Sequence, residues 1–299
     1  MHIFTSYLKP FCRYLRLRIH WAQHIAKFEF ISRINKCITP RSADIGAGRD
    51  AHALGWWTAD YQEGVVIDSE TILPFDNEQL NFAYCSMFFE HIDDQVAANL
   101  LREVHRSLKK NSKFRIVVPN FWLYCDKYKS GDYDFFWSLN KSNPNLETWG
   151  LYNVPTDLEH LFISMITSIH NLPHTIVSYP WQENLHALPP KVCHPFQQRL
   201  KGYYCGPAPE ISSEQVKYNF NKLHHNDFLV WLFRETNRSQ VADKTFNSWH
   251  ENFWNFEKLQ AFAAQAGFSR VEESSFDMQY FPREKSGHSP IALYFNLIK

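Results

Sequence analysis

Short apolar runs separated by polar turns dominate residues 42–120. Five of these runs are compact enough to form strands that are buried on both faces of a sheet. They are residues 42–46, 56–60, 65–68, 81–86 and 114–118. Buried strands joined by crossovers predict a mostly parallel sheet with helices on its faces.

Apolar side chains recur at helical spacing in residues 93–108, which therefore predict a helix that buries one face. Asp93 or Asp94 is suited to cap its N-terminus, because a carboxylate can accept from the first backbone amides. In the turn that follows, Asn111 can adopt the left-handed conformation that glycine would otherwise supply.

The C-terminal part of the chain returns to the same alternation. Residues Phe256–Ala266 predict a second amphipathic helix, and Gly267 is suited to end it. Residues 268–272 and 291–298 then predict a final pair of strands. These elements together predict an α/β domain with a doubly wound sheet.

A stretch rich in aromatic residues interrupts this pattern. It covers residues 121–245, so that the α/β core comprises residues 42–120 and 246–299. Within it, residues 157–169 and 213–234 predict helices. The aromatic rings either stack on the apolar faces of sugar rings, as part of a substrate lid, or form the core of the insertion itself.

Residues 1–41 form a separate basic segment, with eight Lys or Arg residues and one acidic residue. Residues 10–28 within it predict an amphipathic helix. This helix either packs on the α/β core and covers the ligand, or rests on anionic lipids at the inner face of the membrane. The sequence leaves both interpretations open.

The composition narrows the classes of function. The formal net charge is zero and no central basic patch is present, which argues against nucleic-acid binding. The six cysteines include no C-x-x-C pair, and the chain shows no secretory leader or membrane-spanning run. We therefore expect a cytoplasmic protein with reduced thiols.

A glycine turn follows the first predicted strand and marks the candidate ligand site. Gly46 and Gly48 allow a tight turn and a close approach of the backbone to a ligand. Asp50 occupies the place of the third glycine of a dinucleotide fingerprint, so a ligand without phosphates fits better. Asp44 can accept from an ammonium or hydroxyl group, and Asp60 is placed to bind a ribose.

Several motifs in this order resemble class I S-adenosylmethionine (SAM)-dependent methyltransferases, and most closely a compact type often linked to polysaccharide synthesis. They read DIGAG, GWWTAD, VVID, ILPFDNEQLNFAYCSMFFEHI, LLREVHRSLKKNSKFRIVVPN and FEKLQAFAAQAGF. The resemblance implies a sheet of order 3-2-1-4-5-7-6 and SAM as the cofactor. It also implies that Asp68 approaches the adenine and that Ser86 lies at the end of a strand beneath the cofactor.

The reaction that this resemblance implies is transfer of a methyl group, and we expect the acceptor to be a sugar hydroxyl of a glycan or glycolipid. A hydroxyl is a weak nucleophile, so a neutral histidine would accelerate the step by taking its proton. The candidates, in order, are His250, His91 and His225. We expect no metal. The alternatives are a small-molecule or lipid acceptor, or a catalytically inactive methyltransferase fold that acts as a binding subunit.

Overall fold

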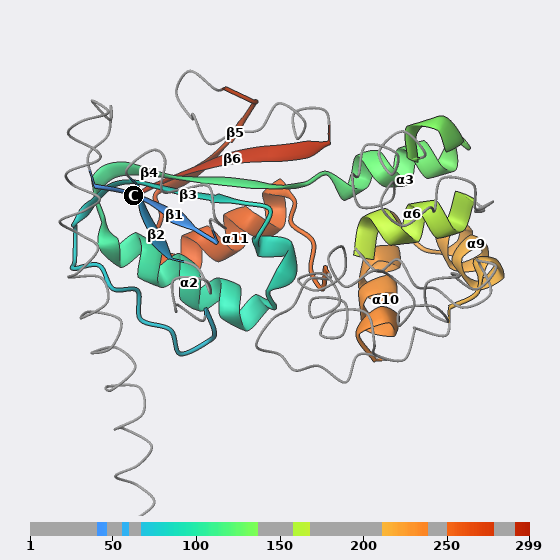
Figure 1. Ribbon diagram of the computed structural model, residues 1–299, viewed down its shortest axis with the longest axis horizontal. Helices are drawn as coiled ribbons and strands as arrows, with labels where there is room; N and C mark the ends of the chain where they lie inside the picture. The colour runs from blue at the N-terminus through green and yellow to red at the C-terminus, as the bar shows by residue number, and fades with distance from the viewer. Residues whose placement is uncertain are drawn as a thin grey trace, which may run out of the picture. The chain divides into compact units, whose positions relative to one another are not determined.

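The computed structural model describes residues 41–46, 56–59, 67–136, 158–167, 211–238, 250–277 and 291–299. These residues belong to two compact units (Figure 1). The sheet unit draws on residues 1–119 and 254–299, and the helical unit on residues 120–253. The predicted N-terminal helix, at residues 10–28, lies outside the described residues.

The described part of the sheet unit contains one six-stranded sheet of order β2-β1-β3-β4-β6-β5. Its strands are β1 (Ser42–Ile45), β2 (Trp57–Ala59), β3 (Leu80–Ser86), β4 (Leu108–Pro119), β5 (Arg270–Ser274) and β6 (Ala292–Ile298). Strands β2, β1, β3 and β4 are parallel, and β6 runs antiparallel to β4 and β5. The predicted doubly wound sheet with a C-terminal strand pair is confirmed.

The outermost strand of the predicted order is not seen among the described residues. The prediction of a strand that runs to Asp68 is wrong, since Ile67 and Asp68 lie outside any strand. Instead, the Asp68 amide donates to Thr71 Oγ1 at 2.7 Å and the Thr71 amide donates to the Asp68 carbonyl at 3.2 Å. These two bonds close a turn where the apolar run alone predicted extended chain.

Two helices cover one face of the sheet, α2 (Asp94–Ser107) and α11 (Phe256–Ala266) (Figure 1). Both were predicted from their apolar spacing, and their buried side chains join the sheet in one hydrophobic core. Asp93 caps α2 as predicted, because its carboxylate accepts from the amides of Gln95 and Val96.

Gly267 ends α11 in a left-handed conformation, with φ of 101°, as predicted. A Cβ atom at this position would lie 2.9 Å from the His105 ring of α2. Glycine is therefore required here both for the backbone conformation and for the close packing of the two helices.

Strand β4 is longer than the predicted strand at residues 114–118. Asn111 does adopt the predicted left-handed conformation, with φ of 63°. Its amide donates to the Lys299 carbonyl, and the Lys299 amide donates to the Ser112 carbonyl. These contacts with the C-terminus of the chain extend the pairing beyond the residues that an apolar pattern could reveal.

The described part of the helical unit contains α3 (Phe121–Lys129), α6 (Leu158–Thr167), α9 (Ser213–Lys222) and α10 (His225–Arg238). The helix predicted at residues 157–169 corresponds to α6. The single helix predicted at residues 213–234 is instead two helices. Leu223 is extended and its amide ends α9, so His225 begins a helix rather than lying in the middle of one.

Aromatic rings form the core of the helical unit. Tyr128 stacks on Phe162 with ring centroids 4.2 Å apart, and Phe162 stacks on Phe228 at 5.8 Å. The Tyr128 hydroxyl donates to the buried Glu159 carboxylate at 2.8 Å. Of the aromatic residues proposed for a sugar-binding wall, four are buried in this core: Phe121, Tyr124, Tyr128 and Phe136. For these four, the interpretation as core residues is correct.

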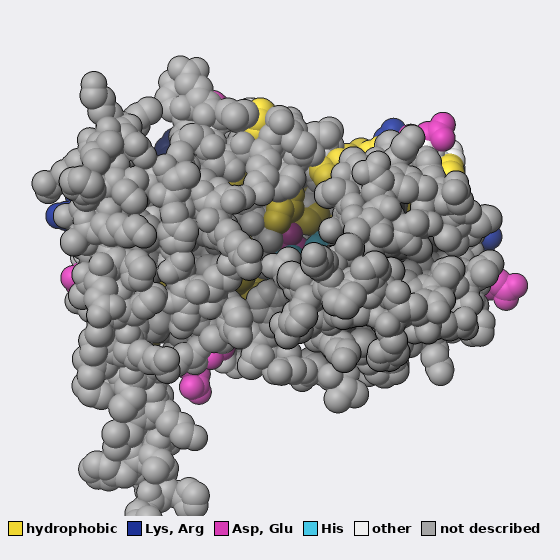
Figure 2. All heavy atoms as spheres, viewed as in Figure 1, with side chains coloured by type: hydrophobic (Ala, Val, Ile, Leu, Met, Phe, Trp, Pro, Cys, Tyr) yellow, Lys and Arg dark blue, Asp and Glu magenta, His cyan; other side chains and the backbone are white. Residues whose placement is uncertain are grey.

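Charged side chains on the face drawn in Figure 2 lie singly among the described residues. Within the described part of the chain, no helix combines the length and the hydropathy that a membrane crossing requires.

Candidate functional site

The site predicted from the sequence lies where the order of the strands reverses. Strand β1 has β2 on one side and β3 on the other, so the chain winds away from β1 in both directions. In open α/β sheets, ligands bind in the crevice outside the carboxyl ends of the strands at such a point. Here those ends are marked by Gly46, which follows β1, and Ser86, the last residue of β3.

Gly46 adopts a left-handed conformation with φ of 71°, and its amide donates to the Ala59 carbonyl of β2 at 2.8 Å. A Cβ atom at Gly46 would lie 2.5 Å from the Phe88 ring. The turn after β3 is also unusual, since Met87 has a φ of 51°. Gly46 is therefore needed for packing between the two turns, in addition to the approach of a ligand that the sequence indicated.

Two acidic side chains lie close to one thiol at this edge. Burial raises the pKa of the Cys85 thiol well above its usual value, and the charges of Asp44 and Glu90 raise it further. Asp44 is 1% exposed. The thiol is therefore uncharged and a poor nucleophile, and both carboxyl groups are near enough to affect it.

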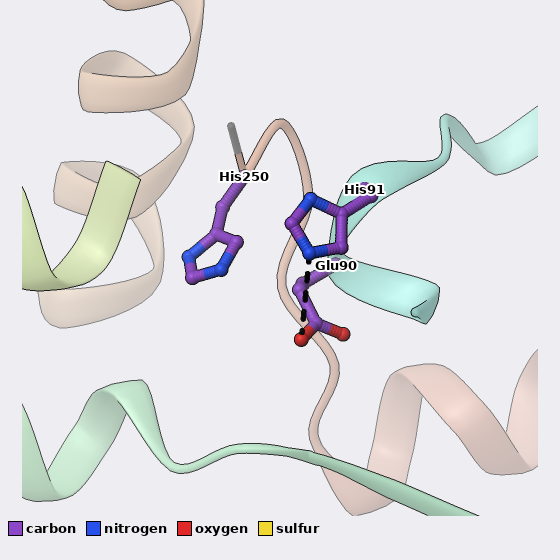
Figure 3. A group of neighbouring side chains, drawn as sticks. All are labelled: Glu90, His91 and His250. Carbon is purple, nitrogen blue, oxygen red and sulfur yellow. Dashed lines mark ion pairs between the residues drawn. The ribbon is translucent and has the colours of Figure 1, made fainter. Parts of the chain in front are cut away.

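Glu90 and His91 belong to the short helix η3 (Phe89–His91), directly after β3 (Figure 3). Glu90 is 1% exposed, and its Oε2 atom has no hydrogen-bond partner among the residues that the structure describes. His91 Nε2 lies 3.9 Å from Glu90 Oε1. Burial raises the pKa of Glu90 to about 8, although a bond from its own backbone amide acts in the opposite direction. At neutral pH the carboxyl group is therefore mostly protonated.

Trp254 fixes the position of η3. Its indole Nε1 donates to the Phe89 carbonyl at 2.9 Å, and its ring packs edge-on against Phe89. Lys258 of α11 lies over the Trp254 ring at 4.6 Å and pairs with Asp94 of α2. This contact links a residue from the far end of the sequence to the turn that carries Glu90.

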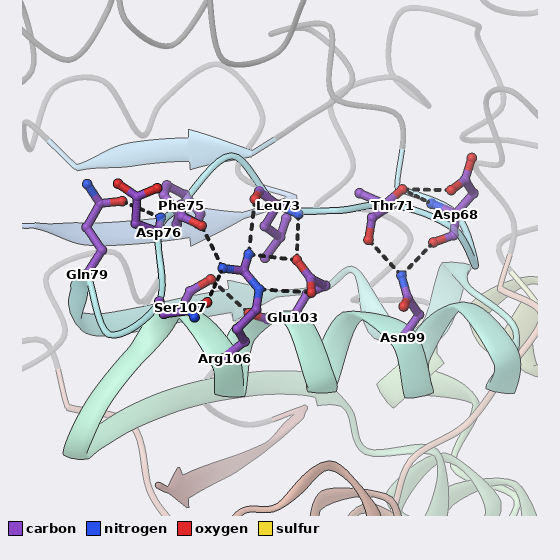
Figure 4. A network of polar contacts seen from close by, with 11 residues as sticks. Asp68, Thr71, Leu73, Phe75, Asp76, Gln79, Asn99, Glu103, Arg106 and Ser107 are labelled. Carbon is purple, nitrogen blue, oxygen red and sulfur yellow. Dashed lines mark hydrogen bonds and ion pairs between the residues drawn. The ribbon is translucent and has the colours of Figure 1, made fainter. Parts of the chain in front are cut away.

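Residues 67–77, called the strap below, carry Asp68 along one side of α2 (Figure 4). Asp68 Oδ1 accepts from the Thr71 hydroxyl at 2.8 Å and from the Glu70 amide at 3.0 Å. Asn99 of α2 donates to the carbonyl oxygens of Asp68 and Thr71, at 3.3 and 2.8 Å. The position of Asp68 is thus set by α2.

A second set of bonds holds the other half of the strap. Arg106 of α2 donates to the carbonyls of Phe75 and Leu73, at 2.8 and 3.2 Å, and to the Asn77 side chain at 3.0 Å. It also forms a bidentate pair with Glu103, whose Oε2 accepts from the Leu73 amide at 2.9 Å. One arginine and one glutamate therefore satisfy three backbone groups of an irregular segment.

His250 lies in the helical unit and is held by the C-terminal end of α6. Its backbone amide donates to the Thr167 carbonyl at 2.8 Å, and its ring Nδ1 lies 2.6 Å from the Ile166 carbonyl. Because a carbonyl only accepts, Nδ1 carries the proton and Nε2 carries the lone pair in the neutral ring. The ring also packs against Phe121, with centroids 5.6 Å apart.

His225 lies elsewhere in the helical unit. It is half-buried at the start of α10, and its ring stacks on Phe220 with centroids 5.4 Å apart. This contact joins it to the aromatic core.

The structure brings four of the predicted site residues to one sheet edge: Asp44, Gly46, Ser86 and His91. Asp68 lies on the strap, while Gly48 and Asp60 lie outside the described residues. The residues that sequence reasoning missed are Glu90 as a titratable group and the α2 side chains that hold the strap. An acidic residue within the apolar run FFEHI was the available signal for Glu90.

These residues fit a cofactor that carries positive charge and no phosphate. Segments 44–46 and 86–91 contain no Lys or Arg, whereas they contain two acidic residues. Gly46 has the left-handed turn that a close approach requires, and Glu90 has an unpartnered oxygen. SAM carries a sulfonium and an ammonium group, which suit such an edge.

Residues 44–116 match the family of methyltransferase domains. The sequence has no match among the curated proteins compared with it. Among solved structures, a SAM-dependent methyltransferase from Archaeoglobus fulgidus is 13% identical, with 90% of this chain and 93% of that chain aligned and a TM-score of 0.35. A SAM-dependent methyltransferase from Mesorhizobium loti is 12% identical, with 89% and 96% aligned and a TM-score of 0.32.

A third solved structure is phosphoethanolamine N-methyltransferase 2 from Haemonchus contortus in complex with SAM. It is 11% identical, with 93% of this chain aligned and a TM-score of 0.34. The aligned part is 57% of that chain, so the present chain spans little more than half of its length. The sheet topology agrees with the matched region: residues 44–116 carry a methyltransferase domain, whose cofactor is SAM.

Proposed function

We propose that the chain transfers the methyl group of SAM to a hydroxyl oxygen, and that the acceptor is a sugar. When bound, SAM supplies a methyl group that is already activated by the sulfonium. The protein therefore has to position the acceptor, exclude water and remove the hydroxyl proton. The methyltransferase domain and the acidic edge of the sheet support the cofactor half of this proposal.

We assign the predicted cofactor-binding residues to different parts of SAM. Gly46 and Ser86 end the two central strands, where the backbone can approach the cofactor. Asp44 is suited to accept from the ammonium group, and Asp68 from the exocyclic amine of the adenine. Asp60 would bind the ribose.

The observation that carries the hydroxyl acceptor is the fixed tautomer of His250. Its Nδ1–H donates to the Ile166 carbonyl, so the lone pair of the neutral ring is on Nε2. A neutral imidazole of this kind can take the proton of a hydroxyl group as the methyl group is transferred. His91 remains the second candidate, and His225, which stacks in the aromatic core, is the third.

The sugar acceptor follows from the resemblance to enzymes linked to polysaccharide synthesis. A test uses SAM labelled in the methyl group with three acceptor classes: a glycan extract, phospholipids and small amines. Methyl ethers of sugars survive both acid and alkali, whereas methyl esters are cleaved by alkali. We expect stable label in methylated monosaccharides after acid hydrolysis. Label that appears only in lipid or amine products would overturn the sugar assignment.

A further inference from the structure

The carboxyl group of Glu90 is buried without a partner for one of its two oxygens. The side chain is 1% exposed, and Oε2 has no hydrogen-bond partner within the described part of the chain. Buried polar atoms in native proteins are nearly always satisfied, because an unsatisfied one costs about 1–3 kcal/mol. An exception at a ligand-binding edge indicates that a ligand completes the environment.

The location of Glu90 at the strand ends narrows the chemistry of that ligand. The charge of its carboxylate reaches the Cys85 thiol of β3, as does that of Asp44 from β1. These are the two strands at which the winding of the sheet reverses, and their carboxyl ends face the ligand crevice. The Trp254 indole holds the turn in place through the Phe89 carbonyl. A cofactor that binds over these strand ends therefore brings its charge close to Glu90.

Ionisable groups near Glu90, or near the Trp254 ring that holds its turn, come from four elements of the described chain. His91 of η3 lies 3.9 Å from Oε1, and Cys85 of β3 is uncharged. Asp44 of β1 contributes negative charge at the same thiol. Lys258 of α11 is engaged with Asp94 and with the Trp254 ring. Lys258 is thus paired with an acid other than Glu90.

We propose that Glu90 senses the positive charge on the cofactor sulfur: it holds a proton in the ligand-free protein and releases it when the sulfonium of SAM is bound. S-adenosylhomocysteine, the demethylated product, has the same amino and carboxylate groups as SAM but a neutral sulfur. It leaves the proton in place. The protein therefore distinguishes cofactor from product through the protonation state of one buried acid.

Burial raises the pKa of Glu90 to about 8, so a moderate decrease in this pKa changes the protonation state of the group near neutral pH. At pH 7 such a group is roughly nine-tenths protonated. A positive charge within about 4–6 Å lowers the pKa of a carboxyl group by about 1–3. A decrease of that size is sufficient to ionise Glu90 at neutral pH.

Proton release on binding has a consequence for the reaction, and this step rests on the proposed hydroxyl acceptor. The new C–O bond forms as the C–S bond breaks, and the C–S electron pair stays on the sulfur, which becomes neutral. The hydroxyl group loses one proton, and the Glu90 carboxylate, no longer facing a cation, binds one proton. His91, 3.9 Å away, is placed to relay it. Charge and protons balance over the cycle.

The test is calorimetric titration of the protein with SAM and with S-adenosylhomocysteine at pH 7, in two buffers of different ionisation enthalpy. We expect wild type to release about 0.4–0.9 proton more with SAM than with the product. Glu90→Gln should bind both ligands and show no such difference. Glu70→Gln, which neutralises an exposed acid of the strap, should keep the difference. Equal proton counts for the two ligands in wild type, or a difference that survives in Glu90→Gln, would overturn the proposal.

A second measurement needs no variant. The ratio of SAM affinity to S-adenosylhomocysteine affinity in wild type should rise about five- to fiftyfold between pH 6 and pH 8. A flat ratio would refute the proposal even if Glu90→Gln does not fold. Neither experiment contains an acceptor, so an incorrect sugar assignment leaves both results unchanged. A titration in which neither ligand binds would instead contradict the assignment of the cofactor.

Discussion

Replacing Arg106 by methionine tests whether α2 positions the strap for the cofactor. Methionine retains most of the apolar stem and removes the five hydrogen-bond donors of the guanidinium. The carbonyls of Leu73 and Phe75 then lose a charged donor, and Glu103 loses its bidentate partner. The chain should fold, but with a loosened strap.

The expected loss of stability in Arg106→Met depends on how exposed Arg106 and Glu103 are to water. Hydrogen bonds to charged groups contribute about 1.5–3 kcal/mol each when buried. The Arg106 side chain is 30% exposed and that of Glu103 is 15% exposed. Water therefore replaces part of the lost bonding, and we expect a net loss of about 2 kcal/mol in the free energy of unfolding. SAM affinity should fall about tenfold, because binding must now order the segment that carries Asp68.

Urea denaturation and calorimetric titration with SAM measure the two effects. Arg102→Met is a matched control on the same helix, since Arg102 is exposed and, within the described part of the chain, reaches only Asn99, at 3.5 Å. It should behave as wild type in both assays. The reasoning fails if Arg106→Met and Arg102→Met unfold at the same urea concentration. Wild-type SAM affinity in a destabilised Arg106→Met would show that the strap does not serve the cofactor.

Three further substitutions test other parts of the account. Gly46→Ala should lower the free energy of unfolding by about 1–3 kcal/mol, because the new Cβ would lie 2.5 Å from the Phe88 ring. Gly131→Ala is the control, since Gly131 has a similar φ but open space around it, and it should lower the free energy of unfolding less. Equal melting temperatures for the two variants would contradict this. His250→Ala should slow methyl transfer by about 10²–10⁴-fold at unchanged SAM affinity, and His225→Ala should not; full turnover in His250→Ala rejects the base. Glu90 binds its proton more tightly in the folded state, so its stabilising effect is complete below about pH 4.5 and is lost as pH rises through about 8. Urea denaturation of Glu90→Gln should show less loss of stability across this range, by up to about 5 kcal/mol, and an unchanged pH profile would refute the buried acid.

Local signals were sufficient for most of the sheet unit. The first strand, helix α2 with its Asp93 cap, and helix α11 with Gly267 all have patterns that their own residues determine. The predicted end of a strand at Asp68 is wrong because a side-chain hydrogen bond from Thr71 closes a turn there. The spacing of apolar residues gives no sign of such a side-chain hydrogen bond.

The candidate site was predictable where it follows from strand ends and not where it depends on packing. Gly46 and Ser86 could be placed because topology brings the carboxyl ends of neighbouring parallel strands together. The role of Phe88 against Gly46, and the burial of Glu90, depend on side chains from separate segments. In the helical unit, the break at Leu223 has no glycine or proline to mark it.

Titration of SAM into wild type and into Asp44→Asn tests the central claim most directly. Asparagine matches aspartate in shape but cannot carry its charge, and Asp44 lies on β1, directly before the glycine turn. The account predicts one SAM bound per wild-type chain and at least about tenfold weaker binding to a folded Asp44→Asn, since a charged hydrogen bond is lost. Equal SAM affinity in the two proteins, at equal melting temperature, would contradict a cofactor site at this edge of the sheet.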